Sequence, residues 1–180
     1  MKRFLVLIIV LLISCISVVN AQVVDSLLPL RNDLYTIEEI LKVDSISKTE
    51  LYNRTLKWVA LNYNSSNEVL QLRDSIEGEL IGKGLTKTTC HFSRIAKPIT
   101  IEYTFDILCK NNRIKVIYNR FVVTIHNNIN GIDYPYTNSL ELYDMKEKDL
   151  LRVHKSIKSS ISQSLISLKN SIVNGKDEEW

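Results

Sequence analysis

The residue types best suited to chemistry are Cys90, His91 and His126, each at the end of a segment with strand-like alternation. A thiolate and imidazoles are good zinc ligands, and cysteine paired with histidine can also support thiol chemistry. Adjacent residues on a strand point to opposite faces, so Cys90 and His91 are not expected to converge. The three residues are retained as candidates for a metal or hydrolytic site, and no cofactor or catalytic residue is predicted.

Other patterns that could signal a site are better explained by structure. The segment EGELIGKGL carries Gly78, Gly82 and Gly84, but no helix follows it, as a phosphate-binding loop would require. Glycines within a strand mark a bulge or close packing, and this interpretation is preferred. His154 falls within a helical pattern and is expected at the surface or its boundary. No Ser/His/Asp set or paired-carboxylate pattern stands out.

The stretch Pro98–Ile125 contains two apolar-alternating runs joined by Asn111-Asn112. Asparagine tolerates positive φ, so the pattern predicts a hairpin with a two-residue primed turn. Closing the turn at Lys110 and Arg113 places Ile107 opposite Val116, Phe105 opposite Tyr118 and Ile101 opposite Val122. Directly opposed residues share a face, so one face of this hairpin is predicted to be apolar.

The other face of the same hairpin is predicted to be open to solvent. It carries charged and polar residues, and Leu108, Ile117 and Phe121 lie among them. An antiparallel sheet covered on one side shows this division of residue types. Leu108, Ile117 and Phe121 are therefore the predicted binding residues.

The first 21 residues have the features of a secretory signal peptide. A short basic start precedes the apolar run Phe4–Ile13, and small residues precede Gln22. Alternatively, Leu12-Ile13-Ser14-Cys15 resembles a lipobox, which would leave a lipid anchor on Cys15. Either way the protein is predicted to be exported, with a periplasmic or extracellular location and no transmembrane helix in the mature chain.

Removal of residues 1–21 leaves 159 residues with 21 basic and 20 acidic side chains. No strong field for nucleic acid or anionic lipid remains, and nucleic acid is excluded as a partner. Two cysteines remain, Cys90 and Cys109, at opposite ends of the expected sheet. A disulfide requires Cα atoms within about 7 Å. Two free, partly buried thiols are predicted.

The remaining patterns predict a single α+β domain over residues 35–174, after a lead-in segment at 22–34 and before an acidic tail at 175–180. Strands are expected at 35–43, 68–75 and 77–89 in addition to the hairpin. A helix begins at the capping-box sequence Ser47-Lys48-Thr49-Glu50 and ends near Tyr63. A loop is expected at 127–138 and a long amphipathic helix at 146–173. The order is β-α-β-β-β-β-α, an antiparallel sheet with two helices on one face.

This order of motifs resembles a bacterial exported domain-of-unknown-function family with a TATA-binding-protein-like (TBP-like) fold. The resemblance covers residues 37–125 and rests on Val43-Asp44, the helix from Ser47 to Trp58, Asp74 with Gly78, Ile81-Gly82-Lys83-Gly84 and the Tyr103–Arg113 hairpin. It implies a TBP-like fold. The family has no assigned activity, so the resemblance transfers no functional residue.

Together these observations favour a non-enzymatic binding or structural module of the bacterial cell envelope. Its partner would be a protein or another envelope component, bound on the open sheet face. The alternative is a small envelope hydrolase or metal-dependent enzyme at the Cys90/His91/His126 end of the sheet. DNA binding by analogy with the fold fails, because Glu102 and Asp106 would face the phosphates.

Overall fold

The computed structural model describes residues 27–63 and 69–174. The predicted signal peptide, the alternative lipid anchor at Cys15 and the acidic tail lie outside the described residues. Within the described ranges, no helix combines the length and the apolar character needed to cross a membrane.

The longer strands of the described chain form one antiparallel sheet with the strand order β3-β7-β6-β5-β4. Strand β8 pairs with β7 on the same edge as β3, but further along the strand. The elements are β1 (Leu30–Arg31), β2 (Leu34–Tyr35), β3 (Ile37–Lys42), α2 (Lys48–Asn62), β4 (Leu70–Asp74), β5 (Glu79–Phe92), β6 (Ile95–Lys110), β7 (Arg113–Ile129), β8 (Ile132–Ser139), the 3-10 helix η1 (Leu140–Leu142) and α4 (Glu147–Asn174).

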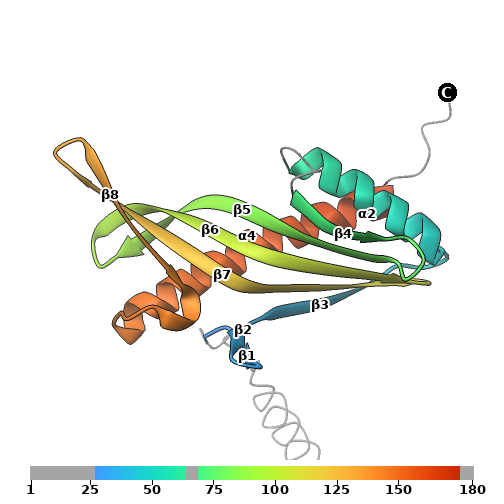
Figure 1. The fold of residues 1–180 in the computed structure, drawn as a ribbon, viewed down its shortest axis with the longest axis horizontal. Helices are drawn as coiled ribbons and strands as arrows, with labels where there is room; N and C mark the ends of the chain where they lie inside the picture. The colour runs from blue at the N-terminus through green and yellow to red at the C-terminus, as the bar shows by residue number, and fades with distance from the viewer. Residues whose placement is uncertain (1–26, 64–68, 175–180) are drawn as a thin grey trace, which may run out of the picture.

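Both helices lie on one face of this sheet, and α4 runs along most of its length (Figure 1). The sheet residues beneath them are buried, including Phe105, Ile107, Val116 and Tyr118. At the start of α2, Ser47 Oγ accepts a hydrogen bond from the Glu50 amide, as the capping sequence predicts. The predicted fold class is therefore confirmed: an α+β arrangement of an antiparallel sheet and two helices.

The predicted hairpin register holds near its turn, where Ile107 lies opposite Val116 and Phe105 opposite Tyr118. The predicted turn type is wrong, because only Asn112 has a positive φ, of 62°. A primed turn requires positive φ at the first central residue. Contacts with the start of α2 set this geometry: Asn111 Oδ1 accepts from the Lys48 amide, at 2.8 Å, and the Asn112 amide donates to the Ile46 carbonyl, at 3.0 Å.

Further from the turn, a β-bulge changes the register. Between the pairs Thr104–Asn119 and Glu102–Val122, β7 contains one residue more than β6, and Arg120 has a φ of 52°. The extra residue reverses which side chains face the helices. Phe121 is therefore fully buried, and its predicted place on the open face is wrong. The predicted pairing of Ile101 with Val122 is wrong for the same reason, since Ile101 pairs with Val123.

The loop predicted at 127–138 is instead a second long hairpin. Strand β7 continues to Ile129, and β8 returns along it from Ile132. The turn at Asn130-Gly131 has positive φ at both residues, 53° and 84°, which is the pattern of a type I′ turn. Pro135 disfavours a central strand, but it is accommodated because β8 pairs on one edge only.

The strand glycines allow close packing, as the sequence analysis favoured. The Phe105 ring lies over Gly82 and the Tyr103 ring over Gly84; a Cβ at either glycine would come within 2.4 Å of a ring atom. Side chains at these positions would displace the aromatic core under the helices.

Candidate functional site

The face of the sheet that the helices do not cover presents a mixed polar and apolar surface. Leu108 and Ile117, two of the three predicted binding residues, lie on this face and are half-buried. Leu85, on β5, is 52% exposed. Phe121 does not belong to this surface, and Val122 takes its place because of the bulge.

A hollow of about 930 Å³ lies at the bulge. Open-face residues from three strands form much of its lining: Ile81, Lys83 and Leu85 of β5, Glu102, Thr104 and Asp106 of β6, and Asn119 and Val122 of β7. The apolar side chains therefore lie beside charges of both signs. A concave surface that combines apolar side chains with polar groups able to orient a ligand is the usual form of a binding site.

Asp106 is the most unusual group in this lining. Its Oδ1 atom is buried and has no hydrogen-bond partner among the described residues. Burial, followed by the nearby carboxylate of Glu79, raises the pKa of Asp106, and Lys115 opposes the shift. A buried carboxylate oxygen without a donor is costly, so this position favours a ligand that supplies a hydrogen bond or a positive charge.

The structure does not bring the candidates Cys90, His91 and His126 into one site, and Cys90 and His91 diverge as the sequence analysis expected. Cys90 is buried on the helix side near Ser156, and burial raises the pKa of its thiol. His91 is exposed and, as the next strand residue, points to the opposite face. No group of three or more potential metal-ligating His, Cys, Asp or Glu residues occurs in the described part of the chain. Both Cys90 and Cys109 are free and buried, which confirms that they form no disulfide.

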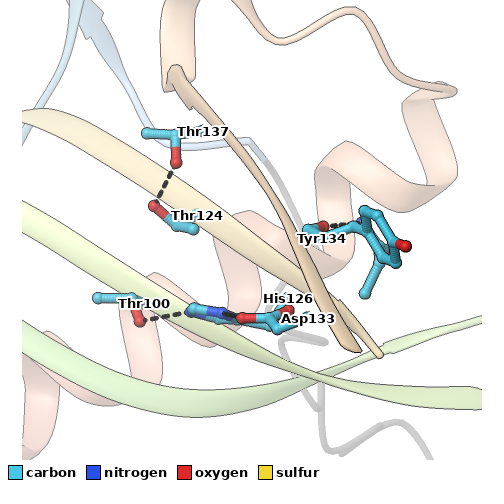
Figure 2. A network of polar contacts seen from close by, with 7 residues as sticks. Thr100, Thr124, His126, Asp133, Tyr134 and Thr137 are labelled. Atoms are coloured by element: carbon cyan, nitrogen blue, oxygen red, sulfur yellow. Dashed lines mark hydrogen bonds and ion pairs between the residues drawn. The ribbon is translucent and has the colours of Figure 1, made fainter. Parts of the chain in front are cut away.

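His126 instead belongs to a polar network on the open face, shown in Figure 2. The Thr100 Oγ1 atom lies 3.0 Å from His126 Nε2, and His126 Nδ1 lies 2.7 Å from Asp133 Oδ2. The three residues come from β6, β7 and β8. An adjoining hollow of about 380 Å³ is lined by residues that include Lys87, Thr100, His126 and Asp133.

This network has the order of groups found in a hydroxyl–imidazole–carboxylate relay. A neutral imidazole that donates its Nδ1–H to Asp133 presents Nε2 as an acceptor for the Thr100 hydroxyl. Acyl transfer also requires donors for the developing oxyanion. Thr100 lies between Lys87 and Thr124 in a continuous ladder, so the surrounding backbone amides are hydrogen-bonded within the sheet. Among the described residues that line the hollow, Lys87 is the one lysine or arginine.

Sequence reasoning missed Thr100 and Asp133 because Asp133 falls in the segment predicted as a loop. The polar alternation Thr124, His126, Asn128 followed by an Asn-Gly turn was the available signal. It indicates a strand with one polar face and a hairpin behind it, which would have placed Asp133 beside His126.

His154 is also placed differently from the prediction. It lies on α4 and is fully buried against the first described residues, where its Nδ1 atom accepts a hydrogen bond of 2.7 Å from the Leu28 amide. The Tyr35 ring packs edge-on against it at 4.5 Å. Burial and, to a smaller extent, Lys158 lower the pKa of His154 to about 4, while Glu141 acts in the opposite direction.

An antiparallel sheet with two helices on one face and an open second face defines the chain as an α+β protein with a TBP-like fold. Residues 38–124 match the family model described as "Domain of unknown function (DUF4468) with TBP-like fold". Residues 38–124 are therefore similar to the DUF4468 family. The predicted resemblance is therefore confirmed.

Two solved structures show the same fold. A DUF4468 family protein from Bacteroides ovatus aligns with a TM-score of 0.62 at 12% identity, covering 88% of this chain and 95% of that one. A TBP-like protein from Parabacteroides distasonis aligns with a TM-score of 0.55 at 13% identity, covering 79% and 97%. A search of curated proteins gave no match.

Proposed function

We propose that this chain is a non-enzymatic binding module of the bacterial cell envelope that uses the open face of its sheet. The observation that carries the proposal is the hollow of about 930 Å³ at the bulge. Its apolar residues Ile81, Leu85 and Val122 lie among Lys83 and Asp106. An apolar group of the partner would pack on the first set while its polar groups pair with the second.

The unpartnered oxygen of Asp106 narrows the chemistry of that partner. A ligand amide or ammonium group placed in the hollow would supply the missing donor. The Lys83 ammonium and the Glu102 carboxylate are exposed on the neighbouring strands and could fix the orientation of the ligand. The envelope location rests on the signal-peptide and lipobox patterns in the first 21 residues.

Site-specific photo-crosslinking tests this surface. A benzophenone side chain introduced at Leu85 is expected to form discrete adducts in bacterial envelope preparations, because Leu85 is exposed at the hollow. The matched control is Leu61 on α2, which is 74% exposed and not part of the hollow lining. Equal labelling at both positions, or no adduct at Leu85, would contradict the proposal.

A second candidate function is ester or amide hydrolysis, which the Thr100–His126–Asp133 network favours. Thr100 Oγ1 would attack the acyl carbon while its proton passes to His126 Nε2. The leaving group would depart with that proton, and water would then release the acyl group from Thr100. Two observations favour the binding function instead. Asp133 is exposed, and the nearby backbone amides are hydrogen-bonded within the sheet, so they are not free to stabilise an oxyanion.

The two candidates predict opposite results with p-nitrophenyl acetate. On the binding proposal, the protein is expected to release p-nitrophenol no faster than variants that lack the relay, Thr100→Val and His126→Gln. Thr124→Val serves as the control, because Thr124 lies on the same face and bonds only with Thr137 among the polar contacts drawn in Figure 2. Turnover that is lost in both relay variants and kept in Thr124→Val would establish the hydrolase.

A further inference from the structure

The sheet ends in two hairpins that separate from each other. The β6–β7 ladder stops at the pair Ile99–Ile125, although β6 extends beyond it to Ile95 and β7 extends to Ile129. Beyond the last pair, β6 is bonded to β5 and β7 is bonded to β8. Figure 1 shows the tips of these hairpins pointing apart. We call residues 92–98 and 126–134 the fork.

The fork presents two strand edges that face each other. The outer edges of Ile95–Pro98 and His126–Ile129 pair with β5 and β8, and the ladders of the described strands contain no partner for their inner edges. One side-chain bond crosses the space, from Lys97 Nζ to Asn127 Oδ1 at 2.6 Å. Unpaired strand edges are templates for another strand, because their amide and carbonyl groups form hydrogen bonds most readily with extended backbone.

Besides the bonded pair Lys97 and Asn127, the helix side of the fork carries uncovered apolar side chains. Strand alternation places four of them on this side, and all are more than half exposed: Ile95 at 62%, Ile129 at 58%, Ile132 at 58% and Tyr134 at 52%. The helices do not extend over them. Apolar residues concentrated in this way mark an interaction surface.

The opposite side of the fork is polar and carries more positive than negative charge. Lys87 and Asp133 line the hollow of about 380 Å³, and Arg94 is exposed at the tip of the β5–β6 hairpin. The Asp133 carboxylate already bonds with His126. The charges left to meet a ligand are therefore basic, so this side favours acidic groups.

We propose that the fork binds an extended segment of a partner polypeptide as an added strand. Its backbone pairs with the inner edges of β6 and β7, while alternate side chains contact Ile95, Ile129 and Ile132. Acidic side chains on its other face meet Lys87 and Arg94. This site is separate from the hollow at the bulge and extends the proposed binding function to a defined class of ligand.

Selection of random peptides displayed on phage against the purified chain tests this proposal. The enriched peptides are expected to alternate apolar with polar or acidic residues, because only every second side chain of a strand faces the apolar side. The double variant Ile129→Ser/Ile132→Ser is expected to weaken their binding at least about tenfold, as loss of central apolar contacts does. Both isoleucines are exposed, so thermal stability should be retained, and Leu61→Ser is the matched control.

Three outcomes would overturn the proposal: no enrichment over an unrelated immobilised protein, peptides that bind the fork variant as tightly as the native chain, or a dimer in analytical ultracentrifugation that the fork variant abolishes. The last result would assign the fork to a second copy of this chain. Peptides whose binding is lost in Leu85→Ser but kept in the fork variant would place them in the hollow, which supports the proposed function and rejects this inference. The two proposals can therefore fail separately.

Discussion

Replacing Phe121 with serine is expected to lower the free energy of unfolding by about 3–5 kcal/mol, the usual cost of truncating a buried aromatic side chain. Phe121 is fully buried, and its ring packs near Tyr103 with 6.3 Å between centroids. For a chain of this length each kcal/mol corresponds to roughly 2–4 °C in the melting temperature. A shift on the order of 10 °C should therefore appear in a thermal melt.

Leu85→Ser provides the comparison, because Leu85 is on the open face and half exposed. Surface substitutions usually change stability by less than about 0.5 kcal/mol. Equal melting temperatures for the native protein and Phe121→Ser would contradict the buried position of Phe121 and would instead indicate that its side chain lies on the open face. A large loss in both variants would show that the open face is covered.

The second large effect is expected from His154 as a dependence of stability on pH. Its pKa in the folded state is about 4, against an ordinary value of 6.5. As the pH falls below 6.5, His154 becomes protonated in the unfolded chain but stays neutral in the folded chain. The free energy of unfolding therefore decreases until the pH reaches about 4. At 1.36 kcal/mol for each unit of pKa shift, the full loss is about 3 kcal/mol.

Chemical denaturation at several pH values, compared between the native chain and His154→Gln, measures this contribution. Glutamine keeps an oxygen that can accept the Leu28 amide but does not titrate in this range. The variant is expected to lose less stability between neutral pH and about pH 5, by about 2 kcal/mol. All other titratable groups are common to both proteins. If the free energy of unfolding changes with pH in the same way in both, His154 does not cause the pH dependence.

The order of the main elements could be predicted because strong local signals mark each one. Apolar residues recur at helical spacing along α4, Ser47 caps α2, and strict alternation marks the strands on both sides of Asn111-Asn112. The bulge could not be predicted by counting from the turn. Yet core residues before it, such as Val116, and after it, such as Val123, differ in parity, and only an inserted residue reconciles them.

The site was less predictable than the fold, because it depends on that bulge and on β8. One added residue moves Phe121 into the core and Val122 to the open face. The return of β8 along β7 places Asp133 beside His126, two residues that a predicted loop would leave unrelated. Cross-strand contacts depend on register, and a shift of one residue exchanges the two faces.

The Asn111-Asn112 turn joins two elements that are distant in sequence. Asn111 Oδ1 accepts the amide of Lys48, the first residue of α2, and Asn112 Oδ1 accepts the amide of Ile46. For an isolated hairpin, Asn-Gly would be the better turn. Glycine at position 112 would remove the second acceptor, and losing one such hydrogen bond costs about 0.5–1.5 kcal/mol. Optimising this turn for the hairpin alone would thus weaken its hydrogen bonds to the segment that begins α2. The residues at this turn must satisfy two elements at once.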